Sequence, residues 1–350
     1  MPDLLKVRYL YSIAGSNIYF GEIAITISAL CFFAHLNIKG IKLASQFQNI
    51  MVLILVGIVL LFLCLALSKT GFSSPNTLSF ISDAPINLVN ILTALSISPA
   101  LFIGFDCISQ VPEELKFKAS EASTLAMFSI VMGALIYCSI LLFTSFGLSF
   151  EELTSGKIAW ATGHTVEFYF GKIGLWSLGI ALLSAIIAGI NGFYMAASRL
   201  LFAMARGKIQ PDYFGVLDRK YHPPKNAIIF ILIVSLIAPW FGRNVLAWIV
   251  GTTSFGAAIA YLYTSLAVLK LYKQENNKLF LPAIFGSIAG VIFLLLIIPG
   301  LKSTLSLPSA IIVIAWAAIG YAFYRFYDLK VMHYSKEKLD EFVLNRYVKK

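Results

Sequence analysis

Long apolar stretches separated by short polar segments run through the whole chain. Crossing the hydrocarbon core of a bilayer, ~30 Å thick, takes roughly 20 apolar residues of helix, whereas a membrane barrel shows short segments of alternating polarity. The stretches here are continuous, so they predict helices, which satisfy their own backbone hydrogen bonds inside the membrane. Nine are present, at 19–36, 48–68, 89–111, 124–148, 173–198, 226–241, 245–269, 279–300 and 305–324. The predicted fold class is therefore an all-α integral membrane protein with about nine transmembrane helices.

The composition agrees with this class. Hydrophobic residues make up 59% of the 350 residues and charged ones 13%, with a mean hydropathy of +0.84. Soluble domains are about 45–50% apolar and about 25% charged. Soluble, disordered and disulfide-rich proteins are therefore excluded. The four cysteines lie in predicted spans without C-x-x-C spacing and are interpreted as small buried apolar residues: Cys31, Cys64, Cys107 and Cys138.

The positive charge orients the bundle. Cytoplasmic loops of membrane proteins carry an excess of Lys and Arg. Of the 27 such residues, all but seven fall on one side, and the seven are Lys6, Arg8, Lys69, Lys157, Lys172, Arg243 and Lys302. We therefore expect a multi-pass plasma-membrane protein with a cytoplasmic C-terminal tail. Nine spans then place residues 1–18 outside the cytoplasm. The net charge of +10 belongs to a basic membrane rim, so the expected partner is the lipid bilayer and not nucleic acid.

The third predicted span is unusual. Pro99 removes a backbone donor, Gly104 lowers the cost of leaving helical geometry, and Asp106 places an ionisable group deep in the membrane. Such features favour a broken helix whose backbone groups face a cavity, which is how many secondary transporters build substrate sites. The alternative is a proline-kinked helix in which Asp106 bonds to a neighbouring helix.

Other polar residues of the spans carry weaker signals. Asn191, Thr252, Thr253 and Ser254 could line the same cavity. In membrane helices such side chains also bond to their own backbone or pack between helices. Asp106 is nearly the only deep ionisable group, so the paired groups of a membrane enzyme are missing, and no channel filter motif is visible. No two histidines share a helix face, and we expect no catalytic residue, no metal site and no cofactor.

Several segments together resemble a known family. Gly104-Phe105-Asp106 followed by Pro112-Glu113-Glu114 resembles the sixth-helix signature of the amino acid–polyamine–organocation (APC) permeases. Residues 191–211, 36–42 and 222–227 resemble the end of that family's eighth helix, the loop between its fourth and fifth helices, and the entry to its ninth helix. The order and spacing of these segments agree over almost the whole chain.

The resemblance implies twelve helices, arranged as two inverted five-helix repeats and two extra helices. The nine spans then correspond to helices four to twelve. The implied organisation is an extracytoplasmic segment at 1–18, the end of the first repeat at 19–68, the second repeat at 69–271 with its first helix broken at 99–106, the extra helices at 279–324 and a cytoplasmic tail at 325–350.

Two departures from the family pattern matter. The first three helices, including the broken first helix that binds substrate in the family, are not in this sequence, which leaves open a truncated remnant without transport activity of its own. Some proton-coupled relatives carry a lysine in the fifth helix, where this chain has Leu55. The coupling ion, H⁺ or Na⁺, therefore stays open.

The resemblance implies secondary active transport of an amino acid or related amine by alternating access. Substrate would lie against the unwound backbone of Ala100, Leu101, Phe102, Ile103, Gly104 and Phe105, with Phe105 as an aromatic wall or gate. Pro99 would support the helix break, and Asp106 would anchor it by accepting hydrogen bonds.

Overall fold

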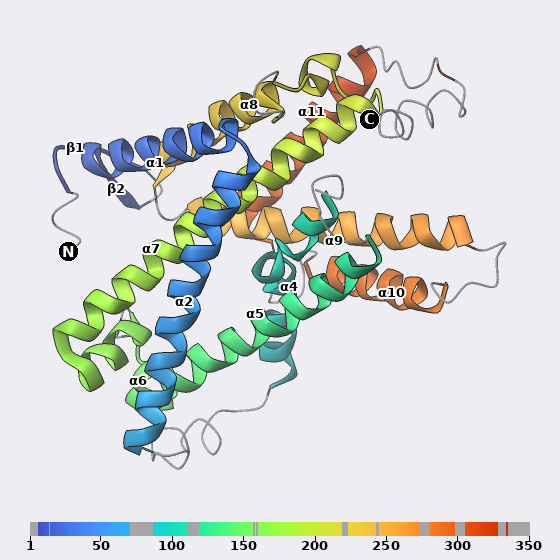
Figure 1. Ribbon diagram of the computed structural model, residues 1–350. Helices are drawn as coiled ribbons and strands as arrows, with labels where there is room; N and C mark the ends of the chain where they lie inside the picture. The colour runs from blue at the N-terminus through green and yellow to red at the C-terminus, as the bar shows by residue number, and fades with distance from the viewer. Residues whose placement is uncertain are drawn as a thin grey trace. The chain divides into compact units, whose positions relative to one another are not determined.

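The protein is almost entirely helical. The computed structural model describes residues 6–13, 15–70, 87–110, 119–156, 158, 160–218, 223–242, 245–272, 280–297, 305–327 and 334 (Figure 1). The α-helices are α1 (Phe20–Ile38), α2 (Ile41–Thr70), α4 (Leu88–Phe102), α5 (Ala119–Gly147), α6 (Phe150–Thr154), α7 (Ala161–Arg206), α8 (Lys225–Ser235), α9 (Val245–Tyr272), α10 (Phe280–Ile297) and α11 (Leu307–Phe326). Three 3₁₀ helices, η2 (Phe105–Gln110), η4 (Asp212–Gly215) and η5 (Ala238–Phe241), complete the helical part.

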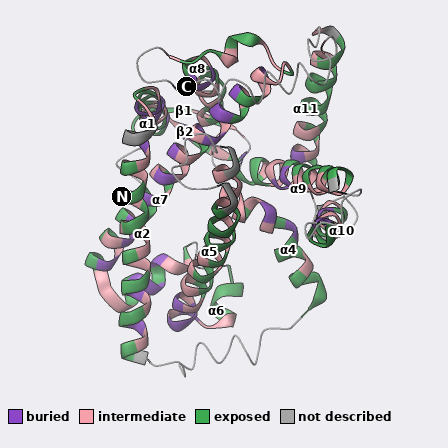
Figure 2. Cartoon of the chain, turned by 45° about the vertical axis from the view of Figure 1, so that its right-hand side comes forward, coloured by how far each residue is buried: buried purple, intermediate pink, exposed green. Residues whose placement is uncertain are grey.

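Each predicted span overlaps one of these helices. Among the described residues, seven helices are long and apolar enough to cross a membrane, and the segments Lys225–Phe241 and Phe280–Leu296 are shorter apolar helices. Large apolar side chains remain exposed along these helices, as expected of surfaces that face lipid (Figure 2). The predicted fold class, an all-α integral membrane protein, is confirmed.

Two helices differ from their predicted form. α7 begins at Ala161, twelve residues before the predicted start, and its two parts meet at a kink at Gly171, where φ is 59°. The span predicted at 226–241 is interrupted after Ser235 and resumes as η5. Pro239 explains this break, because proline has no N–H to donate to the Ser235 carbonyl four residues earlier and its ring clashes with that carbonyl.

A small hairpin precedes the first helix, in a segment for which no element was predicted. Strands β1 (Tyr9–Ile13) and β2 (Ser16–Tyr19) pair antiparallel. The Tyr11 hydroxyl donates a 2.6 Å hydrogen bond to the carbonyl of Trp240 in η5, and Ile18 is buried. The hairpin is therefore anchored on a segment more than two hundred residues away in the chain.

The chain divides into two compact units. The first contains 1–27, 86–103 and 236–338, and the second contains 28–85, 104–235 and 339–350. In the first unit α9 packs against α4, α10 and α11. In the second unit α7 packs against α2, α5, α8, η2 and η4.

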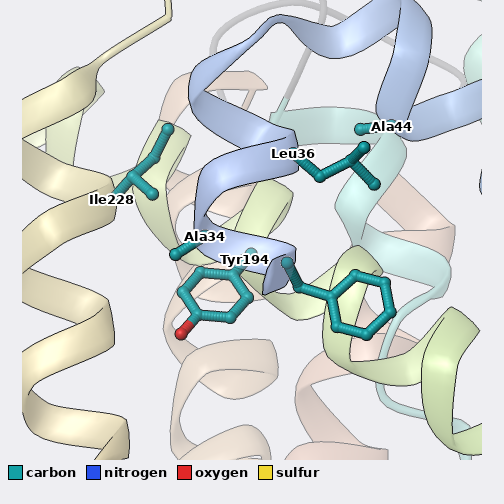
Figure 3. Packing of buried hydrophobic residues seen from close by; sticks show 6 residues of the cluster. Ala34, Leu36, Ala44, Tyr194 and Ile228 are labelled. Carbon is teal, nitrogen blue, oxygen red and sulfur yellow. The ribbon is translucent and has the colours of Figure 1, made fainter. Parts of the chain in front are cut away.

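The second unit has two apolar cores. One joins α1, α2, α7 and α8 and contains Phe33, Ala34, Leu36, Ala44, Tyr194 and Ile228 (Figure 3). The other joins α2, α5 and α7 through stacked aromatic rings. The ring centroids of Phe62 and Phe143 lie 5.8 Å apart, and Phe170 stacks on Phe62 at 5.2 Å. These two cores hold the long helix α7 in place along much of its length.

The short helix α6 lies outside the spans and has a well-formed amino-terminal cap. The Ser149 hydroxyl accepts a hydrogen bond from the Glu152 backbone, and the Glu152 carboxylate accepts one from the Ser149 backbone at 2.9 Å. This reciprocal pairing satisfies two backbone donors at the helix start. The same backbone hydrogen bond lowers the pKa of Glu152, because it favours the charged carboxylate.

Candidate functional site

Helix α4 ends in the middle of the unusual span. Its first turn is capped by Asn87, whose side chain accepts a 3.0 Å hydrogen bond from the Val89 backbone. Pro99 is buried inside the helix, which continues to Phe102. The prediction of an unwound backbone was therefore wrong for Ala100–Phe102, because the helix passes Pro99 and ends only before Gly104. Ile103 leaves helical geometry with ψ of 133°, and Gly104 has φ of 121°. The backbone of a residue that has a side chain is strained at such a φ, so glycine is the residue that permits this turn.

Beyond the turn, the chain continues as a 3₁₀ helix that is tied back to Gly104. The Gly104 backbone N–H donates to Asp106 Oδ1 at 3.0 Å, and the Cys107 N–H donates to the Gly104 carbonyl at 3.1 Å. Asp106 therefore accepts a backbone hydrogen bond at the break itself. A carboxylate within a membrane span needs such donors, because leaving it unpaired in a low dielectric is costly.

Along the sequence, the chain passes from the first unit to the second at the break. Ala100–Ile103 belong to the first unit, where α4 packs against α9 and α10, and Gly104–Asp106 belong to the second, where η2 packs against α5 and α7. All of these residues are partly exposed except Leu101, which is exposed. The remainder of the signature, Pro112-Glu113-Glu114, lies outside the described residues, as do His222 and nearly all of the tail at 325–350.

Asn191 lies in the second unit as part of a buried amide cluster. Its Oδ1 accepts a 2.8 Å hydrogen bond from Asn37 Nδ2, and its Nδ2 donates to the Ala44 carbonyl at 2.9 Å and to Gln48 Oε1 at 3.1 Å. Asn37 and Asn191 are fully buried. The cluster cross-links α1, α2 and α7, so the structure gives Asn191 a packing role. Sequence reasoning missed Asn37 and Gln48, although both are polar residues in or beside apolar runs.

The hydroxyl residues of α9 lie in the first unit. Thr252 donates to the Trp248 carbonyl one turn earlier at 2.9 Å, and it lies 3.4 Å from the Ser309 carbonyl on α11. Thr253 is partly exposed. Ser254 is 2% exposed, and its hydroxyl has no hydrogen-bond partner among the described residues. Asn191 and these three residues thus belong to different units, and their lining of one cavity stays a prediction.

No group of three His, Cys, Asp or Glu residues that could hold a metal ion is found within the described part of the chain. An apolar cavity is present in the second unit between α2, α5 and α7, and its lining contains none of the predicted substrate residues. Its lining includes Leu55.

Comparison with known proteins decides the family. The family described as "Amino acid permease" matches residues 7–324, which is most of the chain. The chain belongs to the amino acid permease family. The APC resemblance is thereby confirmed, and this permease belongs among transporters, not enzymes.

Individual relatives of the permease are distant. The low-affinity putrescine importer PlaP of Escherichia coli (strain K12) is 24% identical over 316 residues, covering 84% of this chain and 66% of that protein. The methylthioribose transporter and the branched-chain amino acid permease BcaP of Bacillus subtilis (strain 168) are each 24% identical over 243 residues, covering 68% of this chain and 49% of theirs. The permease therefore spans less than two thirds of the length of these relatives.

Proposed function

We propose that this permease carries an amino acid or a related amine across the plasma membrane by secondary active, alternating-access transport. The family and the names of its relatives support this substrate class, since they include a putrescine importer and a branched-chain amino acid permease. Alternating access around a discontinuous helix is a common design of secondary transporters. The C-terminal tail lies in the cytoplasm, as the distribution of Lys and Arg favours.

The observation that carries the proposal is the interruption of α4 at Ile103–Gly104. Substrate lies against the backbone from Ala100 to Phe105, with Phe105 as a wall. Asp106 does not touch substrate but holds the break open through the Gly104 N–H.

Replacing Gly104 tests this site. A side chain at φ of 121° costs about 1–3 kcal/mol of backbone strain, although a Cβ there would meet no atom within 4 Å. The purified protein is reconstituted into liposomes, and uptake of labelled putrescine, leucine and a mixture of other amino acids is measured under proton and sodium gradients. We expect Gly104→Leu to reduce uptake about tenfold or more.

The matched control is Gly320→Leu in α11, where a Cβ also meets nothing within 4 Å and φ is ordinary for a helix. We expect this variant to keep its uptake. Equal uptake by both variants would refute the substrate site. If the parent protein accumulated none of the panel under either gradient, the transport proposal itself would be wrong.

A further inference from the structure

A second membrane span is interrupted besides the one at Gly104. Helix α8 ends at Ser235, and the chain resumes shortly afterwards as η5. In a continuous helix the N–H of residue 239 would donate to the Ser235 carbonyl, but residue 239 is proline. The break therefore leaves this carbonyl without its helical donor. In the interior of a bilayer such a group needs another partner, because the hydrocarbon offers none.

The break lies near the middle of the membrane. Ser235 is ten residues beyond Lys225, where α8 begins, and a rise of 1.5 Å per residue gives a depth of about 15 Å in a core of about 30 Å. Helix α7 ends at Arg206 on the same side of the membrane, because only a loop connects it to α8. Tyr194 lies twelve residues before that end, at a depth of about 18 Å. Tyr194 and Ser235 are therefore at similar depth.

The Tyr194 hydroxyl is a buried polar group beside this part of α8. Its ring belongs to a core that also contains Ile228, with Ile231 and Leu232 packed against it (Figure 3). These three residues of α8 and Ser235 are spaced by three, one and three, which places them on one face of the helix. Tyr194 is 2% exposed, so the described chain itself encloses its side chain. The hydroxyl has no hydrogen-bond partner among the described residues.

A buried hydroxyl donor and a carbonyl that lacks its helical donor thus occur at one depth on two helices that pack together. Leaving either group unpaired destabilises the fold, because a polar group removed from water loses its hydrogen bonds. The core around them is apolar, so a buried ion would lack a counter-charge there. A water molecule is neutral and needs only hydrogen bonds, of which a buried water makes about two to four.

We propose that a buried water molecule is bound at the break of α8, between Tyr194 and Ser235. The water accepts a hydrogen bond from the Tyr194 hydroxyl and donates one to the Ser235 carbonyl. The Ser235 side chain offers its hydroxyl as a third partner. The water takes the place of the N–H that residue 239 lacks, and it makes the interruption of α8 a stable feature of the membrane interior. The site does not rest on the proposed transport function.

Radiolytic footprinting tests this site. Ionising radiation splits water into hydroxyl radicals, which oxidise side chains next to bulk or bound water. The full chain is purified in detergent, exposed to a short X-ray pulse, and analysed by mass spectrometry of its peptides. We expect Tyr194 to be oxidised about tenfold faster or more than Phe33, an aromatic residue of the same core that is 3% exposed.

Pro239→Ala tests the second partner of the water. Alanine restores the backbone N–H that a continuous α8 uses to bond the Ser235 carbonyl, so we expect the oxidation rate of Tyr194 to fall to that of Phe33. The matched control is Pro211→Ala, which changes a proline just before η4, in the loop outside the membrane. We expect this variant to leave the oxidation rate of Tyr194 unchanged.

The melting temperature of Tyr194→Phe is a second, independent measurement. Removing a hydroxyl that binds a water lowers the stability of the protein, whereas removing an unpaired buried hydroxyl leaves it unchanged or raises it. We expect Tyr194→Phe to melt at a lower temperature than the parent in detergent. Tyr263→Phe is the control, because that side chain is 70% exposed, and its melting temperature should not change.

Three results would overturn the proposal. The first is oxidation of Tyr194 no faster than that of Phe33, because two slow rates mean that no water is bound and two fast rates mean that bulk water enters the core. The second is an unchanged oxidation rate of Tyr194 in a folded Pro239→Ala. The third is a melting temperature of Tyr194→Phe equal to or above that of the parent, and this result decides even where Pro239→Ala does not fold.

Discussion

Asn191 is a single buried side chain through which α7 holds two other helices. Its amide uses both ends, accepting from Asn37 and donating to Ala44 and Gln48. Within a bilayer the apolar surfaces of helices gain little from leaving lipid, so polar contacts and close packing take a larger share in holding helices together. Measured values for such contacts average about 0.6 kcal/mol and reach about 1.7 kcal/mol, with a larger penalty when a buried partner is left unpaired.

Removing the Asn191 amide should destabilise the second unit. Asn191→Leu leaves the buried amide of Asn37 without its interhelical acceptor, so we expect a loss of about 1–3 kcal/mol, measured by thermal unfolding in detergent. Ser177→Ala on the same helix is the control, because Ser177 is only partly buried and bonds only to the Ile173 carbonyl among the contacts that the structure describes. Identical melting temperatures for the two variants would contradict a cross-linking role.

The helix pair α9 and α10 shows how elements approach each other without side chains between them. Gly286 and Gly290 lie four residues apart on α10 and face Ser265 and Leu262 of α9. A Cβ at Gly290 would lie 2.9 Å from the Leu262 Cβ and 3.0 Å from its Cα. Small residues at this spacing let two membrane helices pack closely.

A large side chain at Gly290 should therefore separate the two helices. Gly290→Leu meets the backbone of Leu262, which cannot move as a side chain can, so we expect a loss of about 1–3 kcal/mol in thermal unfolding. Gly320→Leu places the same side chain where no atom lies within 4 Å and should change stability by less than about 0.5 kcal/mol. Equal losses would show that glycine content, and not this contact, sets the stability.

For the whole molecule, the uneven distribution of Lys and Arg predicts which loops face the cytoplasm. The loop that contains Glu151 and Lys157 is predicted to lie on the side poor in Lys and Arg, and the loop with η4 on the side rich in them. These charges set the orientation of the helices while the chain is inserted into the membrane, and helix packing does not set it. The orientation is therefore testable without any knowledge of substrate.

Thiol labelling in whole cells checks this orientation. In a variant whose four native cysteines are changed to serine, cysteine is introduced at Glu151 in α6 or at Tyr213 in η4, both of which are exposed. A membrane-impermeant maleimide should label the Glu151→Cys variant in intact cells and the Tyr213→Cys variant only after the membrane is opened. The opposite pattern would place the tail at 325–350 outside the cytoplasm.

The sequence alone was sufficient for the membrane class, the approximate positions of the spans and the unusual character of residues 99–106. The thickness of the bilayer imposes the span length on the sequence, so apolar runs reveal it directly. Pro99 and Gly104 act through their own backbone, and a local rule therefore points to the place where α4 ends. The family can also be recognised from local motifs such as Gly104-Phe105-Asp106.

Only the tertiary structure decided which residues meet across helices. The partners of Asn191, the contact of Gly290 with Leu262, and the cavity beside Phe62 each depend on how separate helices are packed and rotated. In a chain that is apolar on all sides, hydrophobic periodicity cannot tell a face that meets lipid from one that meets another helix. The hairpin before α1 was missed for a related reason, since its pairing and its anchor on Trp240 depend on contacts that a local pattern does not encode.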